Sequence, residues 1–337
     1  MSVVFSHSSS LEILRAVPPQ AHVLSAVNDS LPLSAITTSG SDLFRLDLSA
    51  FGVSRSPVHV LAAKGASLPR AYGVCVHRTS LSAVPEKMLL KLAPEVYTCG
   101  PELAFIQMSS RLTLLAAVVL GFELCGSYSQ FARLISGFYD RPPLTSVSRL
   151  EQACKAFGGM RGVRNARAAL SYVRDGSRSP METVVSCVLR LPPNMGGYGL
   201  VQPALNHRVK LDAAAARITG TKTCSIDTAW PEQKVGIEYD SDAFHQNPEK
   251  DRKRREALSH MGWSIFVIGL DEIRSYQVLA DKVSLFADLI PHAAASPSFG
   301  EGSELMAGLL RATRFGLGLG AALFASPLPA GAVSVHL

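Results

Sequence analysis

Residues 224–263 read CSIDTAWPEQKVGIEYDSDAFHQNPEKDRKRREALSHMGW, and this stretch decides the fold that we expect for the chain. Residues 224–230 and 234–239 are rich in β-branched and aromatic side chains, which is typical of strands. The tripeptide Pro231-Glu232-Gln233 supplies a turn between them. The stretch therefore predicts a β-hairpin followed by an acidic loop and a basic segment.

A helix is expected after the hairpin. Asn247 is a good capping residue, Pro248 suits the first helical position, and an acidic residue follows at once. Gly262 suits the left-handed residue after a helix, so the helix should end near Met261. Its first turns carry a run of cations, Lys250, Arg252, Lys253, Arg254 and Arg255.

Three carboxylates are expected to meet at one end of the hairpin. Side chains alternate along a strand, so Glu238 and Asp240 point the same way, and pairing of the strands brings Asp227 toward the same edge. Glu238 is the most informative, because its strand is apolar enough to be central and buried carboxylates are rare unless they are paired or metal-bound. Converging carboxylates repel one another, and a divalent cation with hard oxygen ligands relieves that repulsion.

This arrangement suits a phosphodiester substrate. We expect Asp227 and Glu238 to hold Mg²⁺ or Mn²⁺, with Asp240 as a third ligand or as the orienter of a ligand. His245 would be the base for the attacking water or the acid for the leaving oxygen. The basic helix would hold the nucleic-acid backbone, with Arg254 facing inward to steady a phosphate.

Three motifs in this stretch carry a resemblance to a known family. D-x-x-W-P, I-E-Y-D-x-x-x-x-H and D-x-x-R-R-x-x-L-x-x-x-G-W resemble the PD-(D/E)XK nuclease superfamily, and within it the very-short-patch repair endonucleases. The resemblance covers residues 178–292 and implies a restriction-endonuclease-like mixed sheet flanked by helices. It implies that Asp227 is a metal ligand and that His245 takes part in catalysis. Glu238 and Asp240 occupy the E-x-K position, with Asp where the wider superfamily has Lys, as in the repair-endonuclease branch.

The sequence thus predicts a Mg²⁺-dependent endonuclease, a cytoplasmic hydrolase for which DNA is the expected substrate, in repair, phage defence or a toxin–antitoxin system. The missing Lys removes the usual stabiliser of the attacking hydroxide. Two alternatives therefore stay open. One is a catalytically silent DNA-binding or regulatory protein, and the other is a structural protein that keeps the fold without the site.

Residues 1–140 are expected to form a smaller α+β domain ahead of the nuclease-like region. Apolar side chains at helical spacing predict a long helical region from Leu103 to about Leu124. The segment Pro101–Tyr128 resembles abortive-infection type IV toxin–antitoxin regulators, although the winged helix of that group is not apparent. Short strands are predicted at Val58–Leu61, Gly73–His77 and Val96–Cys99, and a short helix around Leu11–Leu14.

The remaining regions are a helical connector over 141–177, the nuclease-like region over 178–292 and a poorly ordered Gly/Ala-rich tail over 293–337. The connector carries a basic stripe that either contacts phosphate or simply faces water, Arg161, Arg164 and Arg167. Glu182 is either the first-helix acid found near the metal in the nuclease superfamily or part of an S-x-x-E capping box with Ser179.

The composition limits the classes of protein to which the chain can belong. The chain has 337 residues, of which 47% are hydrophobic and 18% charged, with a formal charge of +6, so it is globular and tolerates an anionic partner. Six scattered cysteines without a C-x-x-C pair indicate reduced, mostly buried thiols. No membrane span is expected, because residues 112–124 fall short of the roughly 20 needed and Phe315–Val335 is interrupted by Gly and Pro.

Overall fold

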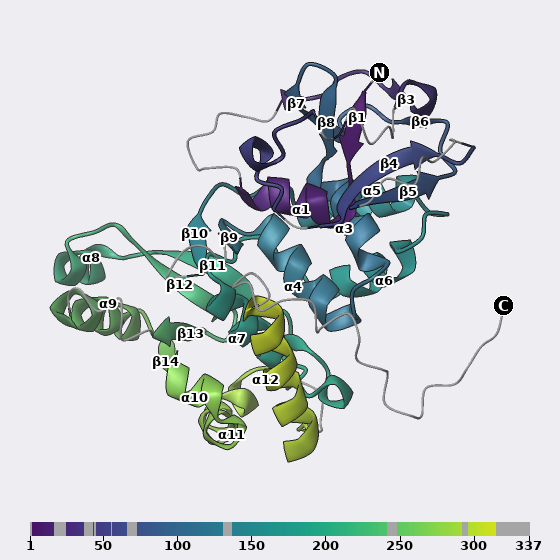
Figure 1. The fold of residues 1–337 in the computed structure, drawn as a ribbon. Coiled ribbons are helices and arrows are strands. Elements are labelled where there is room, and N and C mark those ends of the chain that lie inside the picture. The colour runs from purple at the N-terminus through teal and green to yellow at the C-terminus, as the bar shows by residue number, and fades with distance from the viewer. Residues whose placement is uncertain are drawn as a thin grey trace.

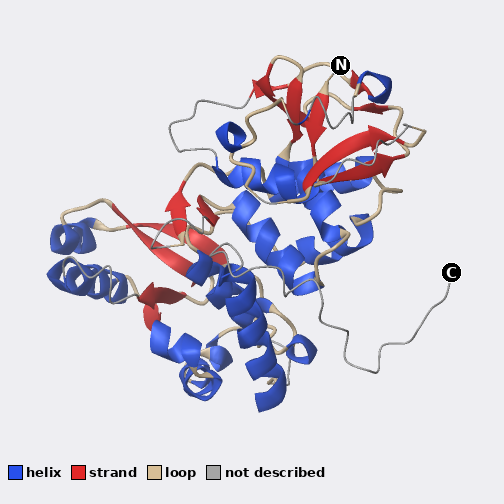
Figure 2. Cartoon of the chain, viewed as in Figure 1, coloured by secondary structure: helices blue, strands red, loops and turns tan. Residues whose placement is uncertain are grey.

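The computed structural model describes residues 2–16, 25–36, 43, 45–54, 56–65, 73–130, 137–240, 248–291 and 296–314. Within these ranges the chain is mixed α/β, as Figure 2 shows, which confirms the expected fold class. One sheet belongs to the N-terminal part and another to the region 178–292 (Figure 1).

The N-terminal sheet has six strands in the order β2-β7-β8-β1-β4-β5. The three strands predicted near residues 58, 73 and 96 are confirmed as β4, β5 and β8. The sequence did not predict β1, a buried three-residue strand that lies inside the sheet, parallel to β8 and antiparallel to β4. The bounds are β1 Val3–Phe5, β2 Ser25–Ala26, β4 Val58–Ala63, β5 Val74–Thr79, β7 Leu89–Ala93 and β8 Val96–Cys99. Two small ladders add β3 (Leu31–Pro32) with β6 (Ala83–Val84), and β9 (Tyr128–Gln130) with β10 (Phe138–Asp140).

Helix α1 (His7–Ala16) confirms the short N-terminal helix, and the long helical region predicted over 103–124 is confirmed as well. It is divided into α3 (Pro101–Ser109) and α4 (Leu114–Cys125). The Thr113 hydroxyl accepts a hydrogen bond from the N–H of Ala116 at 3.2 Å, so it caps a new helix start. Both helices are apolar on nearly every side, which is typical of helices buried in a core.

The connector contains α5 (Val147–Ala156) and α6 (Val163–Leu170), and α5 ends just before Gly158, as expected. Arg167 donates a hydrogen bond to the carbonyl oxygen of Cys154 at 2.7 Å. This member of the basic stripe therefore ties the two connector helices together.

The second sheet has the order β11-β12-β13-β14, with antiparallel pairs followed by one parallel pair. The strands are β11 Ala204–Lys210, β12 Thr223–Trp230, β13 Val235–Asp240 and β14 Ser264–Gly269, and β12 and β13 lie within one residue of their predicted positions. The helices are α7 Pro180–Arg190, α8 Ala213–Thr219, α9 Pro248–His260, α10 Leu270–Arg274 and α11 Tyr276–Ser284. Helix α8 was not predicted, although Asp212 caps a run of four alanines. Helices α10 and α11 follow directly after β14.

Helices cover both faces of this sheet. Trp230, Val235 and Ile237 belong to the largest hydrophobic cluster, which also contains the apolar side of α7 and much of α3 and α4. Cys224 and Ile226 pack with α8 and α9 in a separate cluster. The largest core thus runs from the N-terminal helices into the second sheet, and the proposed domain boundaries stay predictions.

The tail prediction needs a correction. Residues Phe299–Arg314 form helix α12, which packs against α4 and α7 (Figure 1). Leu305, Met306 and Leu309 are buried there, and their i, i+1, i+4 spacing gives α12 the apolar face that its neighbours cover. Residues 315–337 lie outside the described part, and no helix within it is long and apolar enough to cross a membrane.

Candidate functional site

The strand registers place three polar side chains next to one another across the second sheet. Asn206 of β11 lies opposite Asp227 of β12, because the residues on either side of them are paired with one another. Thr228 pairs with Ile237, so Asp227 and Glu238 are the next neighbours along the antiparallel ladder. Asn206 has a φ of 48°, a conformation for which Asn is one of the better-suited residues.

Glu182 joins this row from the first turn of α7. Its N–H donates to the Ser179 hydroxyl at 3.1 Å, so the predicted cap is present. The Glu182 carboxylate accepts hydrogen bonds from the N–H of Arg178 at 2.9 Å and from the Asn206 amide at 2.8 Å. The bond to Asn206 ties α7 to β11, so the Glu182 side chain contacts the second sheet as well as the start of α7, and its role in a site stays a prediction.

The three carboxylates form one electrostatically coupled group. Burial raises the pKa of Glu182 to about 7, and the negative charge of Asp227 adds to the shift. Burial also raises the pKa of Glu238 to about 7, against the opposing charge of Arg254 and with a further increase from Asp227. The pKa of Asp227 is raised by burial as well, although its carboxylate accepts a hydrogen bond from the N–H of Tyr239 at 3.1 Å. The structure therefore unites Glu182, Asp227 and Glu238.

Arg254 reaches this group from α9. Its guanidinium forms an ion pair with Glu238 and donates a hydrogen bond to the carbonyl oxygen of Ser225 at 2.9 Å. The inward orientation expected for this residue is confirmed, but its partner is a carboxylate of the protein. Three buried oxygens on β11, β12 and β13 lack a hydrogen-bond partner within the described part of the chain. They are Asn206 Oδ1, Ser225 Oγ and Glu238 Oε1.

These residues fit a hard divalent cation by their chemistry. Carboxylate and amide oxygens are the ligands that Mg²⁺ and Mn²⁺ prefer, and an unpartnered buried carboxylate oxygen is costly without a ligand. The three carboxylates are too far apart to hold one ion jointly as they stand. Among the described side chains, the group whose ligand atoms all lie within 4.8 Å of one another consists of other residues. Cation binding would therefore require Glu238 to exchange its contact with Arg254 for the ion.

Two predicted site residues cannot be placed. The backbone of Asp240 ends β13, but its side chain lies outside the described part, and so does the whole of His245.

The basic run on α9 is a helix, as predicted, and two of its cations are paired along the helix surface. Arg252 contacts Glu256 at 3.0 Å and Lys253 contacts Glu249 at 2.9 Å. Such exposed pairs are weak, so both cations remain able to exchange partners with a phosphate. Binding of nucleic acid by Lys250, Arg252, Lys253 and Arg254 stays a prediction.

The raised pKa values give a pH prediction. Glu182 binds a proton more readily in the folded state than in the unfolded state, so its contribution to stability should fall as pH rises from about 4.5 to about 7. We expect Glu182→Gln to flatten this decline. The measurement is the free energy of unfolding by urea across pH 4.5–8. Glu232→Gln, in the exposed turn after β12, is the matched control and should follow the wild type; equal profiles for all three proteins would contradict the prediction.

Sequence reasoning missed a second group of chemically active side chains. His59 on β4 pairs in register with Cys75 on β5, and His77 follows two residues later on the same face. Their ligand atoms all lie within 4.8 Å of one another. Burial lowers the pKa of His59 and of His77 to about 4. The alternation C-V-H in a strand was a usable signal for two of these three residues.

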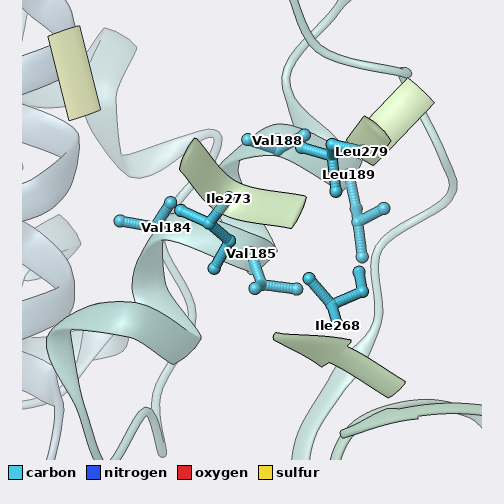
Figure 3. Close-up of a pocket in the computed structure, with 7 residues that line it drawn as sticks. All are labelled: Val184, Val185, Val188, Leu189, Ile268, Ile273 and Leu279. Atoms are coloured by element: carbon cyan, nitrogen blue, oxygen red, sulfur yellow. The ribbon is translucent and has the colours of Figure 1, made fainter. Parts of the chain in front are cut away.

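A small apolar cavity lies beside α7 and is lined by aliphatic side chains from α7, β14, α10 and α11 (Figure 3). The lining residues are Val184, Val185, Val188, Leu189, Ile268, Ile273 and Leu279. Such a lining offers no polar group to orient a substrate, so the cavity belongs to the core.

Comparison with known proteins adds little about function. Two uncharacterised proteins from two strains of Mycobacterium tuberculosis are each 28% identical to this chain over 130 residues. The matched part is 38% of this chain and 43% of each relative, so the chain spans less than half the length of the curated relatives it matches. No protein-family model matches the chain. No solved structure matches it either.

Proposed function

We propose that the chain is a metal-dependent nuclease that hydrolyses phosphodiester bonds in DNA. The observation that carries the proposal is the coupled group of Glu182, Asp227 and Glu238, which three different elements hold together with raised pKa values. A fold gains no stability from three desolvated acids unless a positive partner compensates them, and groups of this kind cluster at functional sites.

The chemistry of the group supports this reaction. Mg²⁺ or Mn²⁺ held by Asp227 and Glu238 would polarise a phosphoryl oxygen and make a bound water more acidic. Glu182 would orient the site through Asn206, to which it is hydrogen-bonded. Arg254, once released from Glu238, is the cation best placed to contact a phosphate, and the other cations of α9 would hold the neighbouring backbone.

The ion pair between Arg254 and Glu238 favours a second candidate, a DNA-binding protein that has lost catalysis. In such a protein the guanidinium neutralises Glu238 permanently in place of a metal ion. The absence of Lys from the position of Asp240 agrees with this alternative. In either case the free and mostly buried cysteines suit a reducing, cytoplasmic compartment.

Cleavage assays separate the two candidates. The full chain is incubated with supercoiled plasmid and with single-stranded DNA in Mg²⁺, in Mn²⁺ and in excess chelator. The nuclease proposal expects cleavage that depends on the added ion and stops with the chelator. Salt-dependent DNA binding without cleavage would select the silent DNA-binding protein, since each phosphate contact contributes about 0.9 to the logarithmic salt slope. Absence of both cleavage and binding would overturn both candidates.

A further inference from the structure

We infer that His59, Cys75 and His77 form a binding site for a borderline-soft transition-metal ion such as Zn²⁺, separate from the carboxylate group. Two imidazoles and one thiol are the ligand types that Zn²⁺ prefers. All three come from two paired parallel strands, which hold them on one face of the N-terminal sheet. The inference does not rest on the proposed nuclease function.

The spacings between the ligand atoms are close to those of a tetrahedral site. The Cys75 sulfur lies 3.5 Å from Nε2 of His77. Zn–S and Zn–N bonds of the usual length at a tetrahedral angle give a separation of about 3.5 Å. Nδ1 of His59 lies 2.7 Å from Nε2 of His77, whereas two imidazoles on one Zn²⁺ are about 3.3 Å apart. A small rotation of the His59 ring would open that gap.

The surroundings hold the ligands in place. The N–H of His59 donates to the Ser9 hydroxyl at 2.9 Å, which ties β4 to α1. The His7 ring stacks on His77 with 3.5 Å between the ring centroids, and the His7 N–H donates to Gln107 at 3.0 Å. His7 has a φ of 50°, a conformation that non-glycine residues rarely adopt and that helps to set its ring over His77.

Access suits a metal ion, and a nearby positive charge opposes it in part. β5 is an edge strand, and Cys75 and His77 are half-buried, so an ion can reach them while His59 anchors the inner side at 7% exposure. Arg111 is close enough to act on all three histidines as a positive charge. The negative charge of a metal-bound Cys75 thiolate would offset part of the combined positive charge of Arg111 and the ion. The three protein ligands leave a fourth position for water or an anion.

The test uses the full chain after its metals are removed with a chelator. Zn²⁺ is titrated against a competing chromophoric chelator, and Co²⁺ is added separately to report thiolate ligation by its charge-transfer absorption. We expect one equivalent of Zn²⁺ per chain and a thiolate band with Co²⁺. His77→Ala should weaken Zn²⁺ binding by at least about tenfold, because even outer-shell changes cost that much. Cys75→Ser should lose the thiolate band.

Matched controls isolate the site. His260→Ala changes an exposed histidine on α9 and Cys154→Ala changes a buried thiol on α5; both should bind Zn²⁺ as the wild type does. If the site variants fold poorly, protection of wild-type Cys75 from alkylation by Zn²⁺ still tests the site. The inference would be overturned if the wild-type protein showed no thiolate band with Co²⁺. It would also be overturned if His77→Ala bound Zn²⁺ as tightly as the wild type does.

Discussion

Replacement of Asp227 by Asn is expected to reduce metal-dependent DNA cleavage by at least roughly a hundredfold, because loss of mere outer-shell contacts already costs 10–100-fold. Asn keeps the shape of the side chain and can still accept the hydrogen bond from the N–H of Tyr239. It removes the negative charge that would ligate a cation in the proposed site and that raises the pKa of Glu182 and Glu238. The variant therefore separates the effect of the charge of the Asp227 side chain from the effect of its shape.

The same change should leave the free energy of unfolding unchanged or increase it, because one member of a mutually repelling group is gone. Lost activity with retained stability is a signature that misfolding cannot produce. Rates of plasmid cleavage and urea unfolding curves provide the two measurements. Asp271→Asn, at an exposed position on α10, is the control and should cleave like the wild type. Cleavage by Asp227→Asn at the wild-type rate would place the active site elsewhere.

Gly162→Ala is expected to be the most destabilising single-methyl change at the junction between α3 and α6. Gly162 has a φ of 100°, and a Cβ there would lie 2.2 Å from the carbonyl oxygen of Ile106 and 2.8 Å from the nitrogen of Ser110. Both contacts are with backbone, which cannot move aside as a flexible side chain does. Backbone strain of about 1–2 kcal/mol and overpacking of about 1–3 kcal/mol predict a loss of about 2–5 kcal/mol in the free energy of unfolding.

Gly159→Ala is the matched control for this prediction. A Cβ at Gly159 meets nothing within 4 Å, so the change should be neutral or stabilising by about 0.4–1 kcal/mol through the unfolded state. The midpoint and slope of urea denaturation report both effects. A Gly162→Ala protein as stable as Gly159→Ala would mean that the backbone around Ile106 adapts far more easily than a packed core should.

The second sheet was predictable because its signals are local. Strands β12 and β13, the turn at Pro231 and the end of α9 at Gly262 follow from period, turn chemistry and capping, each read within a few residues. Burial of Glu238 followed from its apolar strand and is confirmed at 6% exposure. The role of Glu182 was only partly predictable, because its bond to Asn206 joins residues 24 apart in sequence.

The misses share a physical cause: they depend on contacts between distant segments or on elements too short for a period. β1 has three residues and owes its existence to β4 and β8, which pair with it. Helix α12 was predicted to be part of a poorly ordered tail, because its apolar face is buried by α4 and α7, which are distant in the sequence. The His59, Cys75 and His77 group depends on the register between β4 and β5, which no local pattern specifies.

Helix α7 has a consequence for any attempt to excise the second sheet as a fragment. It carries Glu182, and it packs against β12 and β13 on one side and against α4 and α12 on the other. A polypeptide limited to residues 178–292 would lack both α4 and α12 and would expose to water the side of α7 that those helices now cover. A minimal fragment without activity would then be a fragment in which α7 has lost its neighbours. Its inactivity would not test the role of the carboxylates.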